Sequence, residues 1–236
     1  MGYRMTVSAL VALGTCLALA TPVASATPCQ VAMPQRTAMS VRTILGIGWG
    51  SANEHEPRSS LSLAKLFLAD YALRRGDGSA DDRGLAERMI RYSDDGAASL
   101  MAAKYPQAVG AIAGEYGLTA TRAGDDWGAG TTSAADVSDF LVAKLRTDPE
   151  SPIFEWMAAA GSTALDGTEQ DWGTARFPLV LGTKWGWSDS GEPEVASASY
   201  GPGFAVTAHT HGTAAEQTAD VLAALPAMTA GLISCR

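Results

Sequence analysis

The chain has 236 residues, of which 47% are hydrophobic and 18% are charged, and its formal net charge is −8 at pH 7. This length and composition suffice to bury one or two hydrophobic cores, which excludes a disordered tail and a mini-protein held together by disulfides. The 25 acidic residues outnumber the 17 basic ones. We therefore exclude nucleic acid as a partner, because binding it requires a basic surface that neutralises phosphates.

The first 26 residues have the pattern of a secretory signal peptide. Arg4 precedes an apolar run at residues 7–20, and a small-residue tripeptide follows at 24–26. We expect cleavage after Ala26 and a secreted or extracytoplasmic location. Lipidation at Cys16 is the alternative, although the residues before it match such a site poorly. The apolar run is shorter than the roughly 20 residues that cross a bilayer, so we expect no membrane span after cleavage.

The three cysteines are Cys16, Cys29 and Cys235. Loss of the signal peptide would remove Cys16 and leave an even pair in an oxidising compartment, where a disulfide persists. A bridge between Cys29 and Cys235 would close nearly the whole remaining chain, a constraint on the order of 4–5 kcal/mol in the chain-entropy model. We expect this disulfide, with two free thiols as the alternative.

A series of helices is predicted for the middle of the chain, after a short β-branched strand at 41–47. The segment 61–73 is apolar at nearly every position, which predicts a helix buried on all sides, with Ser59 and Ser60 at its start. Three further helices are predicted at 84–92, 107–116 and 134–146, the last with Ser133 or Thr132 as its cap. Another helix follows the break at 93–95 and ends at residue 104. A loop rich in Gly and Asp occupies residues 119–130.

The end of the chain changes to β character. Alternating and β-branched segments predict strands at 178–187, 194–200 and 204–211, the last two joined as a hairpin, and a helix closes the chain at 214–232. Helices followed by antiparallel strands indicate an α+β fold with a helical lobe beside an α/β lobe. We expect one domain at 27–236, its helical lobe at about 61–160 and its α/β lobe formed by 27–60 plus 161–236.

One helix carries a candidate nucleophile. Ser62 and Lys65 lie three residues apart, so their side chains share one helix face. Burial of a lysine disfavours its ammonium form, and a lysine with a lowered pKa can accept the proton of a neighbouring hydroxyl. The spacing alone is equally compatible with a lysine that extends its ammonium to solvent.

Two further segments accompany this pair in chain order. Ser93-Asp94-Asp95 lies in the break between two helices, and Lys184-Trp185-Gly186 lies on the strand that follows the helical region. The order Ser-x-x-Lys, Ser-Asp-Asx and Lys-x-Gly resembles the penicillin-recognising serine enzymes, the serine β-lactamases and D-alanyl-D-alanine peptidases. The resemblance covers roughly residues 58–236. The segment 89–98 resembles the family's passage from helix through Ser-Asp-Asn to helix. The segment 170–173, with Trp187, further resembles exported β-lactamase-like proteins of actinobacteria.

The resemblance implies a β-lactamase/transpeptidase-like fold, with an antiparallel sheet flanked by helices and a reduced helical lobe. It implies Ser62 as nucleophile, Lys65 as general base, Ser93 as proton shuttle and Lys184 as an electrostatic partner of the substrate. The backbone amides of Ser62 and of a residue just past Gly186, with Trp187 as the candidate, would form an oxyanion hole. The implied reaction is acyl transfer through a serine ester, on a cell-wall peptide or a small acyl substrate of the β-lactam kind. We expect no cofactor, no metal and a monomer.

Four features depart from the family pattern. Asp95 replaces the amide of Ser-Asp-Asn with a charge near the substrate, and Trp185 stands where the family usually places a substrate-binding hydroxyl. Residues 119–130 contain no Glu-x-x-x-Asn to activate a deacylating water, only Asp125 and Asp126 as acids. The interval between the two serines is also shorter than in class A enzymes. A catalytically silent binding or envelope-assembly protein with the same fold is therefore the alternative function.

Two histidines near the end of the chain are candidate metal ligands. His209 and His211 alternate on a predicted strand, so both imidazoles face the same side. The sequence suggests no third ligand for a metal ion, so we interpret the pair as an exposed strand end.

Overall fold

The structure is a computed structural model that describes residue 1, residues 29–30 and residues 32–234, with the side chains at 29 and 229–234 left undescribed. The predicted signal peptide, apart from Met1, lies outside the described residues. Cys235 and therefore the predicted disulfide to Cys29 lie outside them as well. In the described part of the chain, no helix is both long and apolar enough to traverse a membrane.

Seven helices, two short 3₁₀ turns and eight strands make up the described part of the chain. The helices are α1 (Ala64–Arg75), α2 (Ala80–Arg91), α3 (Asp95–Lys104), α4 (Ala108–Tyr116), α5 (Ala134–Thr147), α6 (Pro152–Ala158) and α7 (Ala214–Ser234), and the 3₁₀ turns are η1 (Leu61–Leu63) and η2 (Gly173–Arg176). The strands are β1 (Cys29–Gln30), β2 (Thr37–Thr43), β3 (Gly48–Gly50), β4 (Arg58–Ser59), β5 (Thr131–Thr132), β6 (Gly182–Trp187), β7 (Glu194–Gly201) and β8 (Phe204–His211).

The main sheet has the strand order β1-β3-β2-β8-β7-β6, and every pair is antiparallel except β1 with β3. β7 and β8 form the predicted hairpin. Gly203 in its turn adopts a φ of 77°, which favours glycine in a tight turn. The first strand, predicted at 41–47, instead spans Thr37–Thr43, because its backbone pairs with β8 along this whole length. β6 forms one edge of this sheet, which leaves one side of its backbone facing the helices.

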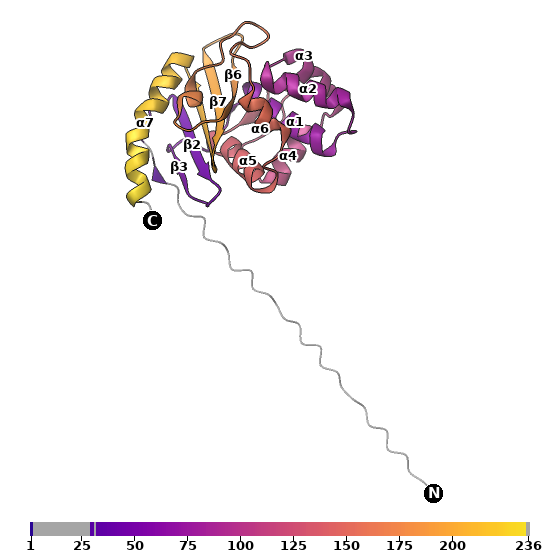
Figure 1. Ribbon diagram of the computed structural model, residues 1–236, viewed down its shortest axis with the longest axis horizontal. Coiled ribbons are helices and arrows are strands. Elements are labelled where there is room, and N and C mark those ends of the chain that lie inside the picture. Colours follow the sequence, from indigo (N-terminus) through magenta and orange to yellow (C-terminus); the bar gives the residue numbers. More distant parts are fainter. Residues whose placement is uncertain (2–28, 31, 235–236) are drawn as a thin grey trace.

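Helices cover both faces of the sheet (Figure 1), with α7 on one face and α5 on the other. α5 is fixed by the Ser138 hydroxyl, which donates to the Ser40 carbonyl oxygen and lies 3.0 Å from the Thr207 hydroxyl. One hydrophobic core fills the space between the sheet and the helices α1 to α6, and a second lies between the sheet and α7. The fold is therefore α+β, with an antiparallel sheet between helical layers, as the sequence predicted.

α1 lies at the centre of the helical part and contacts α2, α3, α4 and α6. Its burial on nearly every face confirms the interpretation of the apolar run, but the segment starts as η1 before it becomes an α-helix at Ala64. Asp70 is a second buried charge on this helix, and its carboxylate lies 2.7 Å from the buried Lys144 ammonium of α5. This ion pair, which the sequence pattern did not indicate, links the helical part to the helix on the sheet.

Two of the differences from the predicted elements have local causes. α2 begins at Ala80 rather than at residue 84 because the Ser79 hydroxyl accepts a hydrogen bond from the Asp82 amide and caps it. α6 was not predicted; it is short, and Pro152 occupies its first turn, where a missing amide costs nothing.

Candidate active site

Ser62 and Lys65 lie at the junction of η1 and α1, on one face as their spacing predicts. The Lys65 ammonium donates to Ser62 Oγ at 2.8 Å and to the Ser93 carbonyl oxygen at 2.7 Å. Lys65 is fully buried and Ser62 is 8% exposed. A buried ammonium within hydrogen-bond distance of a hydroxyl is the arrangement in which lysine can accept the serine proton.

Ser93 connects the two lysines of the site. Its Oγ lies 3.2 Å from Lys65 Nζ and accepts a hydrogen bond from Lys184 Nζ at 2.8 Å. Asp94, the next residue, accepts a hydrogen bond from the Ala97 amide and thereby caps α3, which fixes the break that presents Ser93. The structure thus brings Ser62, Lys65, Ser93 and Lys184 into one continuous network, from η1, α1, the α2–α3 break and β6.

Strained backbone positions flank this network. Leu61 and Ser93 adopt φ values of 48° and 54°, in the left-handed region that non-glycine residues rarely occupy. Such conformations cost about 1–3 kcal/mol each and persist only where the surroundings enforce them, typically at functional sites. Leu61 directly precedes the candidate nucleophile, and Ser93 is itself the connecting hydroxyl.

Gly186 lets the edge strand β6 approach the nucleophile closely. A Cβ atom at this position would lie 2.7 Å from the Ser62 backbone nitrogen and 2.9 Å from the Leu61 Cβ. A side chain would therefore force β6 away from η1. The close approach places the Ser62 amide beside the backbone just past Gly186, where the second oxyanion-hole amide is expected.

Burial is the main influence on both lysines. Desolvation lowers the pKa of Lys65, while the hydrogen bond and charge of Asp95 act in the opposite direction. Desolvation also lowers the pKa of Lys184 well below its ordinary value, and the nearby charge of Lys65 lowers it further. Ser93 Oγ lies within hydrogen-bond distance of both ammonium groups, so the two lysines adjoin one hydroxyl.

Asp95 and Trp127 enclose the Lys65 ammonium. Asp95 Oδ1 accepts a hydrogen bond from Lys65 Nζ, although the Asp95 side chain is itself 59% exposed. The Trp127 ring lies over the same ammonium, 4.4 Å from its centroid, and the Trp127 indole N–H donates to Ser99 Oγ at 3.1 Å. Trp127 comes from the loop at 119–130, so this loop contributes an aromatic wall to the site.

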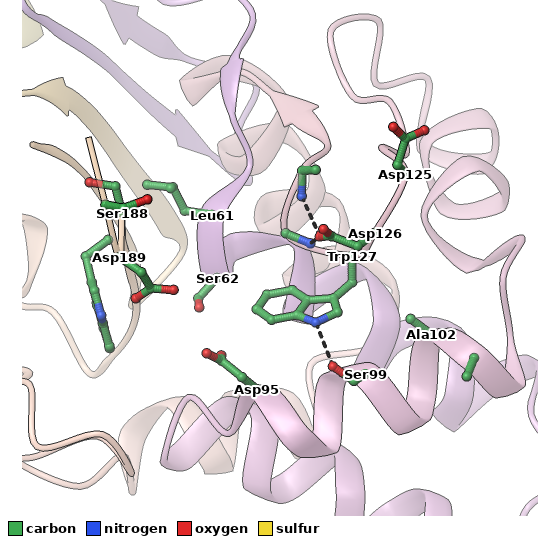
Figure 2. A pocket seen from close by; sticks show the side chains of 15 residues that line it. Leu61, Ser62, Asp95, Ser99, Ala102, Asp125, Asp126, Trp127, Ser188 and Asp189 are labelled. Carbon is green, nitrogen blue, oxygen red and sulfur yellow. Dashed lines mark hydrogen bonds between the residues drawn. The ribbon is translucent and has the colours of Figure 1, made fainter. Parts of the chain in front are cut away.

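Ser62 faces a cavity of about 800 Å³. In Figure 2 it lies between Trp127 and the segment that carries Ser188 and Asp189, with Asp95 on the adjoining wall. Lys65, Ser93 and Lys184 lie behind this surface and are buried. The cavity therefore presents the serine to solvent while its hydrogen-bond network is shielded.

No family model matches this sequence, and neither does any curated protein. Solved structures do match it. They include penicillin-binding protein D2 from Listeria monocytogenes in the cefotaxime-bound form (TM-score 0.59, 18% identity, covering 80% of this chain and 95% of that chain). A β-lactamase from Streptosporangium roseum aligns with a TM-score of 0.63 and 16% identity over 80% of this chain and 91% of that chain. The chain has the β-lactamase fold.

A D-alanyl-D-alanine carboxypeptidase from Mycobacterium tuberculosis shares the β-lactamase fold with this chain as well, with a TM-score of 0.58 and 18% identity over 82% of this chain and 92% of that chain. These matches cover nearly the full length of the solved proteins. The resemblance drawn from the short motifs is thereby confirmed at the level of the fold.

The predicted substrate-binding residues of β6 divide between the two faces of the strand. Lys184 and Gly186 face the serine network, whereas the Trp185 side chain packs with Trp172 and donates to its carbonyl oxygen. Successive residues of a strand alternate in direction, so Trp185 is directed away from the cavity and contributes its carbonyl oxygen as an acceptor for Lys184. Trp187, at the strand end, does line the cavity.

The histidine pair differs from its sequence interpretation. His209 and His211 do face the same side, with ring centroids 6.4 Å apart, but His209 is buried rather than part of an exposed strand end. Glu194 of β7 lies 3.0 Å from His209 Nε2, and the Ser59 hydroxyl of β4 donates to the same carboxylate. Within the described residues no group of three or more His, Cys, Asp or Glu is arranged to hold a metal ion.

Sequence reasoning missed the role of Trp127. The sequence pattern indicates Trp185 and Trp187 as the site's tryptophans, whereas Trp127 is the indole that contacts the candidate base. Its loop position gives no periodic signal, and only the fold of residues 119–130 brings it to Lys65. Its position among glycines and aspartates was the available clue.

Proposed function

We propose that this protein is an extracytoplasmic serine acyl hydrolase or acyltransferase of the penicillin-recognising type, acting on a peptide or small acyl substrate of the cell envelope. The observation that carries the proposal is the continuous contact from Ser62 through Lys65 and Ser93 to Lys184, behind a cavity that exposes Ser62. The β-lactamase fold, shared with solved structures of a penicillin-binding protein and a β-lactamase, supports it.

In the proposed reaction, neutral Lys65 removes the proton of the Ser62 hydroxyl while Ser62 Oγ attacks the acyl carbon. The amide of Ser62, at the start of the helical segment, and the amide past Gly186 stabilise the oxyanion that forms. The bond to the leaving group then breaks, and the leaving group takes a proton from Lys65 through the Ser93 hydroxyl. Water or an amine then attacks the serine ester and releases Ser62.

A second function is favoured by the contacts of Asp95 and Trp127. The Asp95 carboxylate stabilises the charged form of Lys65, and the Trp127 ring covers the same ammonium. Both contacts oppose the role of Lys65 as a base. A catalytically silent binding or envelope-assembly protein that retains the fold is therefore the alternative.

Stopped-flow hydrolysis of a chromogenic activated ester separates the two functions. If the protein is an enzyme, the leaving group is released in a burst whose amplitude equals the protein concentration, and Ser62→Ala abolishes this burst. Ser190→Ala is the matched control, since Ser190 lines the same cavity and should keep the burst. Absence of a burst in the unmodified protein, with the ester still bound reversibly, would support the binding protein.

A further inference from the structure

The cavity in front of Ser62 is lined by acidic side chains. Asp95, Asp125, Asp126 and Asp189 contribute to its wall, and none of its described lining residues is a lysine or an arginine. Among the described residues, Asp125 and Asp189 have no basic side chain within ion-pair distance, and both are exposed. Carboxylates from α3, the 119–130 loop and the segment after β6 thus contribute to the lining of one cavity (Figure 2).

The positive charges of the site do not offset this lining. Lys65 and Lys184 are fully buried behind the wall, and desolvation favours their neutral forms. In its charged form, the Lys65 ammonium forms an ion pair with the Asp95 carboxylate. A ligand in the cavity therefore meets a negative potential, which attracts cations and repels carboxylates.

The aromatic walls are also suited to a cation. The Trp127 ring already lies over one ammonium group, that of Lys65. Trp187 also belongs to the lining, and its indole N–H donates to the carboxylate of Asp166, which adds a further negative charge nearby. Indole faces near carboxylates bind alkylammonium groups by cation–π and Coulombic attraction together.

We propose that the Ser62 cavity selects acyl substrates that carry a cationic group, such as an alkylammonium, and disfavours those that carry a carboxylate. This inference rests on the proposed function, because it assigns a charge class to the same substrate. In Figure 2, Asp189 lies on one side of Ser62 and the Asp125–Asp126 loop on the other, so a cationic group on either side meets a carboxylate of the lining while the acyl carbon meets the serine hydroxyl.

Three nitrophenyl esters of similar size test the inference. They are the 4-(trimethylammonio)butanoate, its neutral isostere 5,5-dimethylhexanoate, and the half ester of adipate. We expect Ser62 to be acylated at least roughly tenfold faster by the cationic ester than by the neutral one at low ionic strength, and slowest by the anionic one. Added salt should narrow these ratios, because the exposed carboxylates are screened. Equal rates for all three, or a faster anionic ester, would overturn the inference.

Two variants test which carboxylates cause the preference for the cationic ester. Asp125→Asn combined with Asp189→Asn should lower the ratio of cationic to neutral rates by roughly 3- to 10-fold, the effect of removing two exposed charge contacts. Glu192→Gln is the matched control, since it removes one carboxylate from the same loop as Asp189 without lining this cavity, and should leave the ratio as it is. An unchanged ratio in the double variant would contradict the assignment.

Binding to Ser62→Ala distinguishes failure of the inference from failure of the proposed function. The carboxamides of the cationic and neutral acyl groups are titrated against this variant and followed by tryptophan fluorescence. If no ester acylates the protein, the proposed function fails, and tighter binding of the cationic amide still supports the charge preference. If Ser62 is acylated without regard to charge and both amides bind equally, the charge preference fails and the proposed function stands.

Discussion

Asp95 controls the protonation of the candidate base. Its carboxylate contacts Lys65 and raises a pKa that burial otherwise lowers. Lys65 accepts a proton only in its neutral form, so at a pH below its pKa a lower pKa means a larger active fraction. The residue that departs from the family motif thus opposes the chemistry that the motif suggests.

Asp95→Asn should therefore accelerate acylation. Removal of the carboxylate lowers the pKa of Lys65, which moves the rising limb of the pH–rate profile to lower pH and speeds the burst at pH 7 by roughly 3- to 10-fold. The measurement is the acylation rate with a neutral ester between pH 5 and 10. Asp125→Asn removes a charge that does not contact Lys65 and should shift the profile less. A slower burst in Asp95→Asn would contradict this role.

At the level of residues, the sequence predicted the members of the network but not their surroundings. The spacing of Ser62 and Lys65 predicted a shared helix face but left open whether the ammonium extends to solvent, and in the structure it contacts Ser62 Oγ. Ser93 and Lys184 were placed through the resemblance, and they do meet Ser62 and Lys65. The direction of Trp185 depends on the phase of strand alternation, and a motif alone does not give that phase.

The helix termini show how local signals differ in strength. Ser133 was one of two expected caps of α5, and its hydroxyl accepts a hydrogen bond from the Asp136 amide. Ser59 and Ser60 were expected to begin the apolar helix, but Ser59 donates to Glu194 and the buried Ser60 hydroxyl has no hydrogen-bond partner among the described residues. The unusual φ at Leu61 redirects the chain there, so tertiary contact overrides the capping signal.

Two serine substitutions test this difference. Ser133→Ala should lower the free energy of unfolding by about 1 kcal/mol, because it leaves helix amides without an acceptor. Ser60→Ala should cost far less, because it removes a buried hydroxyl that makes no hydrogen bond. Urea denaturation of both variants measures the difference. A loss in Ser60→Ala equal to that in Ser133→Ala would show that Ser60 does act as a cap.

Of the properties of the whole molecule, the spatial order of the strands and helices was the hardest to predict from the sequence. The alternation of the last strands predicted the hairpin of β7 and β8, which is a local contact. Pairing of β2 with β8 joins segments far apart in the sequence, and no local pattern specifies it. The fold class was nevertheless predictable, because the succession of helices and then strands, together with the motif order, leaves few arrangements.

The cluster around Glu194 joins β4, β7 and β8, and it should contribute a pH-dependent part of stability. Burial alone would raise the pKa of Glu194, but His209 and Ser59 stabilise its charged form and the pKa falls to about 2, from an ordinary value of 4.5. A carboxyl with a lowered pKa stabilises the fold above its unfolded pKa, and that stability is lost as the pH falls through 4.5 toward 2.

Glu194→Gln should remove this dependence. Between pH 7 and pH 3 the free energy of unfolding of the variant should fall less than that of the parent, by on the order of 1 kcal/mol, since solvent partly screens the Glu194 side chain, which is 15% exposed. Urea titrations at both pH values give the difference. Glu192→Gln, two residues away, is the control and should follow the parent. An identical fall in Glu194→Gln would show that the cluster is not coupled to folding.

The proposed function requires Ser62 to be a nucleophile that Lys65 activates. The most direct test is to incubate the protein with a penicillin and with an activated acyl ester, and to locate any adduct by intact mass and peptide mapping. We expect one acyl group per chain, on the peptide that contains Ser62. This adduct should be absent in Ser62→Ala and strongly reduced in Lys65→Ala. An unmodified protein, or an adduct on another residue, would contradict it.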